Sequence, residues 1–189
     1  DKEFSQQTIS AILRNVNRLT DMINSLFLAS QISAGTFQVH YQVFDLCEVL
    51  QQCIDDIRVS SHRNIQFVCD IPVLLFNGDK NHICSVIINL IRNSITYSPD
   101  ESVITVGIKV EKKTVVLTVA DQGQGITAKD LRHIFEKYFR PNNQQAGLGL
   151  GLYLCFEIVK AHNGTISMES TVGKGTTVTI KFPQHYNHD

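Results

Sequence analysis

The 189-residue sequence has no excess of either charge and no long apolar run. Its formal net charge is −1, so it lacks the basic surface that is typical of nucleic-acid binding. No apolar stretch reaches the length of a membrane-spanning helix. With 43% hydrophobic residues and few Pro and Gly, the composition is that of a globular chain that can bury a core. We therefore expect this chain to contact neither nucleic acid nor membrane.

Regular metal-binding spacings are also missing. The five cysteines show no C-x-x-C pattern and the seven histidines show no H-x₃-H pattern, which argues against a zinc site. Most of the cysteines fall within apolar patterns. We therefore expect them to be small core residues in a reducing compartment, without metal or nucleophilic roles. They are Cys47, Cys53, Cys69, Cys84 and Cys155.

Near the start of the chain, apolar residues recur at intervals of three and four. They are Ile9, Ile12, Val16, Leu19, Ile23 and Leu26. This repeat predicts a helix that packs on other helices, as in a coiled-coil bundle, and Ala34-Gly35 would end it. A surface helix on a globular core is the alternative, which the regular 3.5-residue spacing disfavours. One such helix needs partners from this chain, from a second copy or from further sequence.

Beyond residue 35, strand-like and helix-like patterns follow in blocks. Asp45 and Asp79 each precede a helical apolar pattern and are expected to be N-caps. The blocks predict an α+β fold with a layer of helices on one mixed sheet. Strands are expected at 37–43, 65–71, 102–110, 114–120, 165–170 and 176–182, a short helix around 128–135, and a loop over 136–146.

The stretch AGLGLGLYLCFEIVKAHNG, residues 146–164, places Gly147, Gly149 and Gly151 where a helix is expected to begin. Glycine weakens a first helical turn, so its presence needs a reason. Glycine lets the backbone approach a ligand closely, and the N–H groups at a helix start favour an anion such as phosphate. The stretch matches neither G-x-G-x-x-G nor a P-loop. On this stretch alone, a tight turn with close helix packing remains open.

Two further stretches carry polar groups suited to a nucleotide. Asn89 and Asn93 lie four residues apart on one expected helix face, where their oxygens could hold Mg²⁺. Asp121 follows an apolar strand and precedes Gly123 and Gly125. Its carboxylate only accepts hydrogen bonds, so it can pair with the exocyclic amine of adenine but would face the carbonyl oxygen of guanine. Taken singly, an exposed polar pair and a turn aspartate explain these residues equally well.

A compact aromatic and basic cluster, FEKYFR at 135–140, opens the expected loop. An aromatic latch with a cation for phosphate is typical of a mobile lid over a ligand, so residues 136–146 are expected to order when nucleotide binds. GKGTT at 173–177 is a glycine turn into a strand, for which a plain hairpin is the simpler explanation.

In this order and spacing, N-x-x-x-N, D-x-G-x-G, F-E-x-x-F, G-L-G-L-G-L and G-x-G-T resemble the catalytic, ATP-binding domain of sensor histidine kinases. That domain belongs to the ATPase superfamily shared with gyrase, Hsp90-type chaperones and the mismatch-repair MutL proteins. The resemblance implies a two-layer α/β sandwich, the Bergerat-type ATP-binding fold, preceded by a long bundle-forming helix. Residues 1–35 would be the second helix of the dimerisation hairpin, 36–184 the ATP-binding domain and 185–189 a tail.

The resemblance also implies a role for each matching position, with ATP and Mg²⁺ as cofactors. Asn93 would bind Mg²⁺, Asp121 would read adenine, and the glycine run would serve as phosphate cradle and lid hinge. Phe135 and Phe139 would start the lid, and Arg140 would contact phosphate. The implied nucleotide-binding set is Asn89, Asn93, Tyr97, Asp121, Gly123, Gly125, Phe135, Phe139, Arg140, Gly147, Leu148, Gly149, Leu150, Gly151, Leu152 and Thr176.

Three departures from the family pattern stand out. Thr96 occupies the position where relatives usually carry Lys or Arg, and the lid is short and poor in charge. No histidine stands in an [ST]-H-[ED]-x-R context. The nearest imitation, Ser61-His62-Arg63, lies between an expected helix and an expected strand of the ATP-binding domain, and His62 is expected to be a surface loop residue. The resemblance therefore implies that the phosphorylated histidine lies on a first hairpin helix upstream of residue 1.

The implied function is transfer of the γ-phosphoryl group of Mg²⁺-ATP to that histidine, followed by relay to an aspartate of a response regulator. The implied assembly is a homodimer through the helical hairpin, in the cytoplasm or as the cytoplasmic part of a membrane-anchored sensor. One alternative is a nucleotide-binding regulatory module with slow or absent transfer, which Thr96 favours. Another is a superfamily ATPase that activates water with a glutamate, but residues 81–94 contain no Glu.

Overall fold

The computed structural model describes residues 2–141 and 147–184. Its helices are α1 (Lys2–Ser33), α2 (Leu46–Ser61), α3 (Lys80–Tyr97), α4 (Ala128–Leu131) and α5 (Gly151–Ala161). Its strands are β1 (Gln42–Asp45), β2 (Ile65–Cys69), β3 (Leu75–Gly78), β4 (Ile104–Glu111), β5 (Thr114–Asp121), β6 (Thr165–Thr171) and β7 (Gly175–Pro183).

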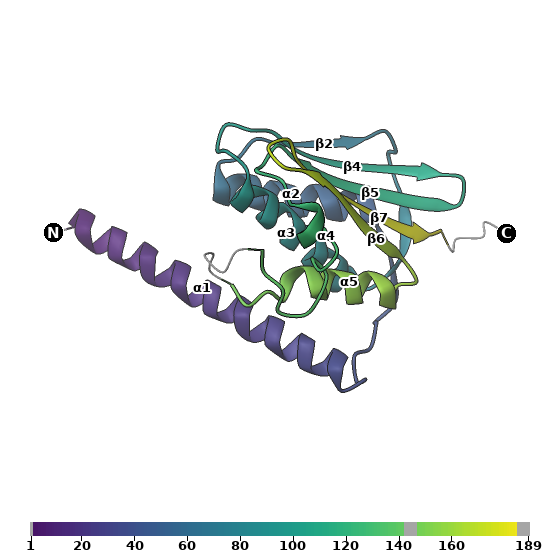
Figure 1. The fold of residues 1–189 in the computed structure, drawn as a ribbon, viewed down its shortest axis with the longest axis horizontal. Coiled ribbons are helices and arrows are strands. Elements are labelled where there is room, and N and C mark those ends of the chain that lie inside the picture. Colours follow the sequence, from purple (N-terminus) through teal and green to yellow (C-terminus); the bar gives the residue numbers. More distant parts are fainter. Residues whose placement is uncertain (1, 142–146, 185–189) are drawn as a thin grey trace.

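A five-stranded mixed sheet forms one layer of the fold and α2, α3 and α5 form the other (Figure 1). The strand order is β2-β4-β5-β7-β6, with β2 parallel to β4 and the remaining pairs antiparallel. The core lies between the layers, where Ile54, Leu90, Ile158 and Leu117 are buried. The expected α+β sandwich is therefore confirmed.

Both predicted N-caps are confirmed. The Asp45 carboxylate accepts the backbone N–H of Cys47 at the start of α2. The Asp79 carboxylate accepts the N–H groups of Asn81 and His82 at the start of α3. His62 is the exposed C-cap of α2, with a left-handed backbone, so its expected place on the surface between helix and strand is also confirmed.

The expectation of one sheet with a strand over 37–43 was wrong. Only Gln42–Asp45 forms a strand there, and it pairs with β3 in a separate two-stranded sheet. The backbone N–H of His40 donates to the side chain of Asp79 instead of to a neighbouring strand, which removes the start of this run from any ladder. The short strand β3 was not predicted, because four residues carry too little alternation to detect.

Two helix boundaries also differ from expectation. The helix expected at 128–135 ends at Leu131, after which His133 and Glu136 donate to carbonyls three residues back, as in tight turns. The glycine-run helix begins at Gly151, so Gly147 and Gly149 precede it. Gly149 has φ +66°, a left-handed conformation that breaks the helical path at that point.

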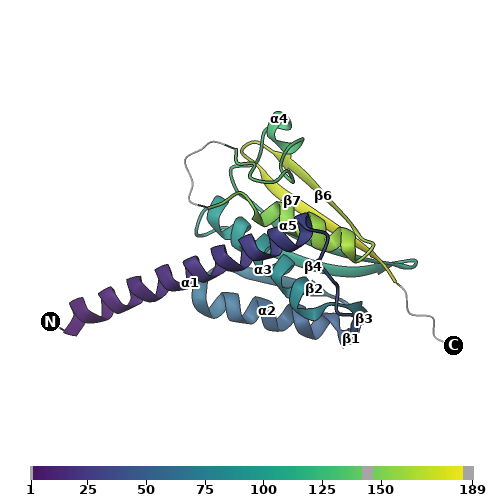
Figure 2. The same cartoon turned by 90° about the horizontal axis from the view of Figure 1, so that it is seen from below.

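Helix α1 lies against α5 near its C-terminal end, and its N-terminal half projects away from the sandwich (Figure 2). Ala29 is buried on this contact. The residues of the predicted apolar seam are exposed, at 45–64% each: Ile9, Ile12, Val16, Leu19, Ile23 and Leu26. Within the described ranges, no helix is both long and apolar enough to cross a membrane.

Candidate functional site

The carboxylate of Asp121 is fixed at the end of β5 by donors from three parts of the chain. Its Oδ1 accepts the backbone N–H of Gly123 at 2.9 Å and that of Thr176 at 3.2 Å. Its Oδ2 accepts the hydroxyl of Ser94, on α3, at 3.1 Å. A carboxylate has about four lone-pair positions, so one position on Oδ2 remains for a further donor.

The loop after Asp121 is held close to the end of α3. The N–H of Gln124 donates to the carbonyl of Tyr97 at 3.1 Å. A Cβ on Gly123 would lie 2.5 Å from that same carbonyl oxygen, so a larger residue would force the loop away from α3. This close approach brings Tyr97, which is 40% exposed, to the edge of the Asp121 site.

Two serines that sequence reasoning missed belong to this network. Ser94 follows Asn93 and is buried on the inward side of α3. The apolar residues Ile87, Leu90 and Ile91 lie on the same side, and their spacing was the sequence signal that could have placed Ser94 there. Ser170 accepts the N–H of Ile126, and its hydroxyl lies 2.9 Å from that of Thr176. These bonds connect Thr176, a member of the predicted nucleotide-binding set, to the loop that follows Asp121.

Asn89 lies against the start of α5. Its Nδ2 donates to the buried thiol of Cys155 at 3.1 Å, and a Cβ on Gly151 would lie 2.7 Å from its Oδ1. Gly151 is therefore required for close approach of the two helices. Asn93 is half-buried one helical turn further along α3. In the ranges that the structure describes, no group of three or more His, Cys, Asp or Glu side chains is placed to hold a metal.

In the glycine run, the backbone contacts the loop at Tyr138, whereas the leucine side chains pack in apolar clusters. The N–H of Tyr138 donates to the carbonyl of Gly149, and a Cβ on Gly149 would lie 2.8 Å from the Tyr138 backbone. Leu148 and Leu150 pack against Ala29 of α1, and Leu152 packs on the main core. These three leucines belong to the predicted nucleotide-binding stretch, and that role stays a prediction for their backbone, because their side chains lie in apolar clusters.

The start of the proposed lid packs on α5. Phe135 lies 5.8 Å from Phe156, between ring centroids, and Phe139 lies 5.7 Å from His133. Arg140 is half-buried. Residues 142–146 of the predicted lid lie outside the described residues. Gly147 is exposed, with open space where a Cβ would lie.

A buried arginine, Arg63, donates hydrogen bonds to the end of α3 and to the turn that follows it. The Arg63 guanidinium donates to the carbonyls of Ile95 and Pro99 and to the Ser98 hydroxyl. Its side chain is 5% exposed, whereas the Asp100 carboxylate that it also contacts is 97% exposed. Arg63 therefore fixes the turn that follows Tyr97 mainly through backbone carbonyls.

Comparison with known proteins identifies the family of this chain. Residues 78–186 match the family described as histidine kinase-, DNA gyrase B-, and HSP90-like ATPase. Since the match covers more than half of the chain, this protein belongs to that family.

Several of the similar proteins are named as histidine kinases. The chain is 27% identical to sensor histidine kinase WalK of Bacillus subtilis, with 97% of this chain and 31% of that protein aligned. It is 32% identical to the adaptive-response sensory kinase SasA of a Synechococcus species, with 97% and 50% aligned. The histidine kinase AdeS of Acinetobacter baumannii superposes with TM-score 0.75 at 23% identity, with 94% of this chain and 84% of that chain covered. The chain thus spans from about a third to a half of these curated relatives.

Proposed function

We propose that residues 36–184 bind Mg²⁺-ATP, with the exocyclic amine of adenine donating to Asp121. The observation that carries this proposal is the hydrogen-bonding of the carboxylate. Gly123 and Thr176 occupy Oδ1 and Ser94 occupies part of Oδ2, which leaves an acceptor directed by fixed neighbours. Guanine would place its O6 acceptor against this acceptor, so adenine is preferred. The solved structure of ShkA, to which this chain is similar at TM-score 0.79 and 18% identity, is titled as a complex with AMPPNP.

The phosphate end is proposed to lie at the start of α5. Helices α2 and α3 carry aspartate caps, whereas among the described residues no side chain caps α5. Its first backbone N–H groups are therefore open to an anion, and the helix dipole favours phosphate there. Gly151 allows this helix start to approach Asn89, which would lie near the phosphates.

Asn93 is the proposed Mg²⁺ ligand. A neutral amide oxygen suits an ion that keeps several waters and binds substrate phosphates, and the metal would supply charge neutralisation at the phosphates. Calorimetry of ATP binding with and without Mg²⁺ tests this role. Asn93→Ala should remove most of the Mg²⁺ dependence, and an Mg²⁺ effect of unchanged size would place the metal elsewhere.

For the whole protein we propose transfer of the γ-phosphoryl group to a histidine on the dimerisation hairpin, and then to a response-regulator aspartate. Residues 1–35 would be the second helix of that hairpin, and its exposed seam would pair with other helices in a homodimer. Catalysis would come from positioning the phosphoryl group and the imidazole within near-attack distance. The proposed location is the cytoplasm or the cytoplasmic side of a membrane-anchored sensor.

Radiolabelled ATP tests the transfer. The 189-residue chain should bind ATP without labelling itself, because none of its seven histidines stands in the acceptor context. The full-length protein should acquire acid-labile, base-stable label. Label on the 189-residue chain that His62→Ala abolishes would overturn the proposed acceptor.

A regulatory module with weak or absent transfer is the second candidate, and Thr96 favours it. The Thr96 hydroxyl donates to the Arg92 carbonyl of its own helix, so it supplies no charge toward a phosphate. ATP binding by the full-length protein without acid-labile label would support this second function. In that case Thr96→Lys should raise labelling.

A further inference from the structure

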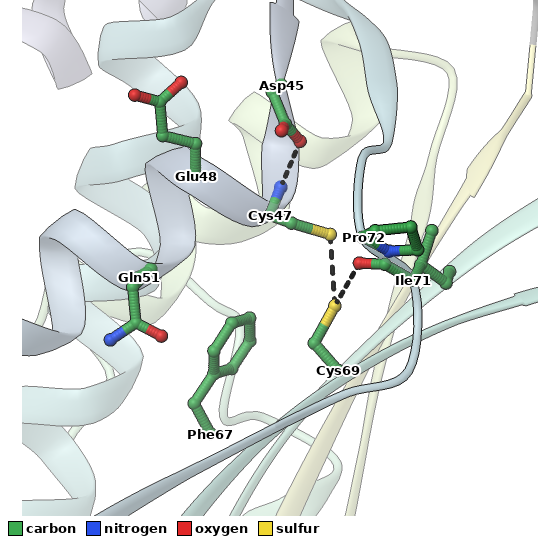
Figure 3. Close-up of a pocket in the computed structure, with 8 residues that line it drawn as sticks. All are labelled: Asp45, Cys47, Glu48, Gln51, Phe67, Cys69, Ile71 and Pro72. Atoms are coloured by element: carbon green, nitrogen blue, oxygen red, sulfur yellow. Dashed lines mark hydrogen bonds between the residues drawn. The ribbon is translucent and has the colours of Figure 1, made fainter.

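Two thiols meet at one end of the α2–sheet interface, away from the nucleotide site. Cys47 lies in the first turn of α2 and Cys69 ends β2, and their Sγ atoms are 3.1 Å apart (Figure 3). This separation is only about 1 Å longer than a disulfide bond. Along the sheet, Cys69 is level with Ile108, which pairs with Leu117, four residues before Asp121 on β5. The pair is therefore separate from the ATP-binding machinery.

A cavity of about 410 Å³ gives access to the pair. Phe67, Ile71 and Pro72 form apolar parts of its lining, and Glu48 and Gln51 of α2 form polar parts (Figure 3). Cys69 is partly exposed, whereas Cys47 is 7% exposed. A small oxidant in this cavity would thus meet Cys69 first.

We propose that Cys47 and Cys69 form a reversible dithiol–disulfide site that is oxidised by small-molecule disulfides such as oxidised glutathione. The Cys69 thiolate attacks one sulfur of the small disulfide, a mixed disulfide forms, and one small thiolate leaves. Cys47 then loses its proton and attacks Cys69 Sγ, which releases the second small thiolate. Two electrons pass to the small molecule and two protons leave the cysteines. A cytoplasmic disulfide of this kind is typically transient and redox-sensing.

The surroundings set the order of the two attacks. Burial, and then the hydrogen bond and negative charge of Cys69, raise the pKa of Cys47 to about 12. Cys47 is therefore the harder of the two thiols to deprotonate, and the more exposed Cys69 attacks first. In a mixed disulfide Cys69 no longer acts on Cys47 in this way, which removes part of the rise in the pKa of Cys47 and lets it act as the resolving thiol.

A second cysteine pair, Cys53 and Cys84, could also be oxidised and must be controlled for. The hydrogen bond from Cys53, aided by Lys80, lowers the pKa of Cys84 to about 7, so Cys84 is a competing nucleophile at neutral pH. Oxidation of the two pairs must therefore be distinguished by peptide mapping. Cys84→Ser is the matched variant, because it removes a partly exposed thiol without touching the proposed site.

The experiment treats the reduced chain with oxidised glutathione, quenches free thiols and maps disulfides by mass spectrometry. The chain and its Cys84→Ser variant should both yield a peptide linking Cys47 to Cys69, and dithiothreitol should reverse the bond. Cys69→Ser and Cys47→Ala should abolish it, with thermal unfolding of each reduced variant showing that it is folded. A lasting glutathione adduct on Cys69, or a bond confined to Cys53 and Cys84, would overturn the proposal.

The unfolding midpoint gives a second test. The two cysteines are 22 positions apart, and closing such a loop restricts the unfolded chain. Oxidation should raise the midpoint by about 5–10 °C in the Cys84→Ser variant and leave Cys69→Ser unchanged. An unchanged or lowered midpoint in Cys84→Ser would show that the native fold does not accommodate the bond.

Discussion

The backbone N–H of Thr176 donates to the carboxylate of Asp121 at 3.2 Å, across 55 positions of sequence. The two residues are paired at the ends of β7 and β5, so the sheet register itself brings the donor to the carboxylate. This bond orients Asp121 toward the side from which we expect adenine to approach.

Replacing Asp121 tests base recognition directly. Losing a hydrogen bond to a charged group costs about 1.5–3 kcal/mol, so Asp121→Ala should weaken ATP binding about ten- to a hundredfold. Asp121→Asn should also weaken ATP binding, because its oxygen would face Gly123 and Thr176 and its NH₂ would face the adenine amine. The same NH₂ can donate to guanine, so the ratio of ATP to GTP affinity should fall in Asp121→Asn. Calorimetry showing equal ATP and GTP affinity in the unaltered protein would contradict the assignment.

The Ser94 hydroxyl should contribute to affinity through Asp121. Ser94→Ala removes its donor to Asp121 Oδ2, and a neutral hydroxyl bond of this kind is worth about 0.5–1.5 kcal/mol. We expect ATP affinity to fall about two- to tenfold in a folded variant. Thr96→Ala is the matched control, because the Thr96 hydroxyl is bonded within its own helix and should leave affinity unchanged. Equal losses in both variants would show that helix propensity, and not Asp121, is responsible.

Gly151 should matter because of the space beside Asn89. Gly151→Ala would place a Cβ 2.7 Å from Asn89 Oδ1, so Asn89 must shift or α5 must move. We expect weaker ATP binding and a lower unfolding midpoint, of which the midpoint loss should be partly recovered in Gly151→Ala/Asn89→Ala. Thermal unfolding of the two single variants and the double variant forms the cycle that measures this coupling. Strictly additive losses would mean that the contact with Asn89 is unimportant.

A buried histidine should make stability depend on pH. His162 Nδ1 bonds the Ile158 carbonyl, and its Nε2 accepts the backbone N–H of Asp79, so the ring must be neutral. Burial lowers the pKa of His162 below its ordinary 6.5, although the nearby Asp79 carboxylate raises it.

The unfolded chain therefore binds a proton more readily than the folded one, and stability is lost as pH falls below about 6.5. Urea unfolding between pH 5 and 8 should show this loss. His162→Gln should be less stable at pH 8 and less dependent on pH, whereas His62→Gln, at an exposed position, should keep the original dependence. A parallel profile in His162→Gln would assign the titration to another group.

Arg63 should be far more important for stability than its ion pair suggests. Arg63→Met leaves the carbonyls of Ile95 and Pro99 without their buried donor, and we expect the free energy of unfolding to fall by about 3–5 kcal/mol. Asp100→Asn removes only the exposed partner and should cost under about 1 kcal/mol. Chemical denaturation measures both. Comparable losses would mean that the charge of Asp100, not the carbonyls, holds the turn.

The sequence was sufficient to predict features that depend on interactions between residues close together in the chain. The caps at Asp45 and Asp79 were predictable, because a carboxylate satisfies N–H groups within its own next three residues. The apolar repeat of α1 was equally readable, since it depends on helical spacing alone. The order of the glycine, asparagine and aspartate motifs indicated the family, because that order can be read along the chain without knowing which segments meet.

Tertiary structure decided everything that depends on which distant segments meet. Ser94 donates a hydrogen bond to Asp121 because α3 packs beside the end of β5. The pattern of residues around Ser94 does not predict this contact. The side chains of Leu148 and Leu150 pack against Ala29 because this contact with α1 removes them from water. Their backbone remains at the start of α5. Cys47 and Cys69 were read as separate core residues; only the packing of α2 on β2 brings their sulfur atoms to 3.1 Å.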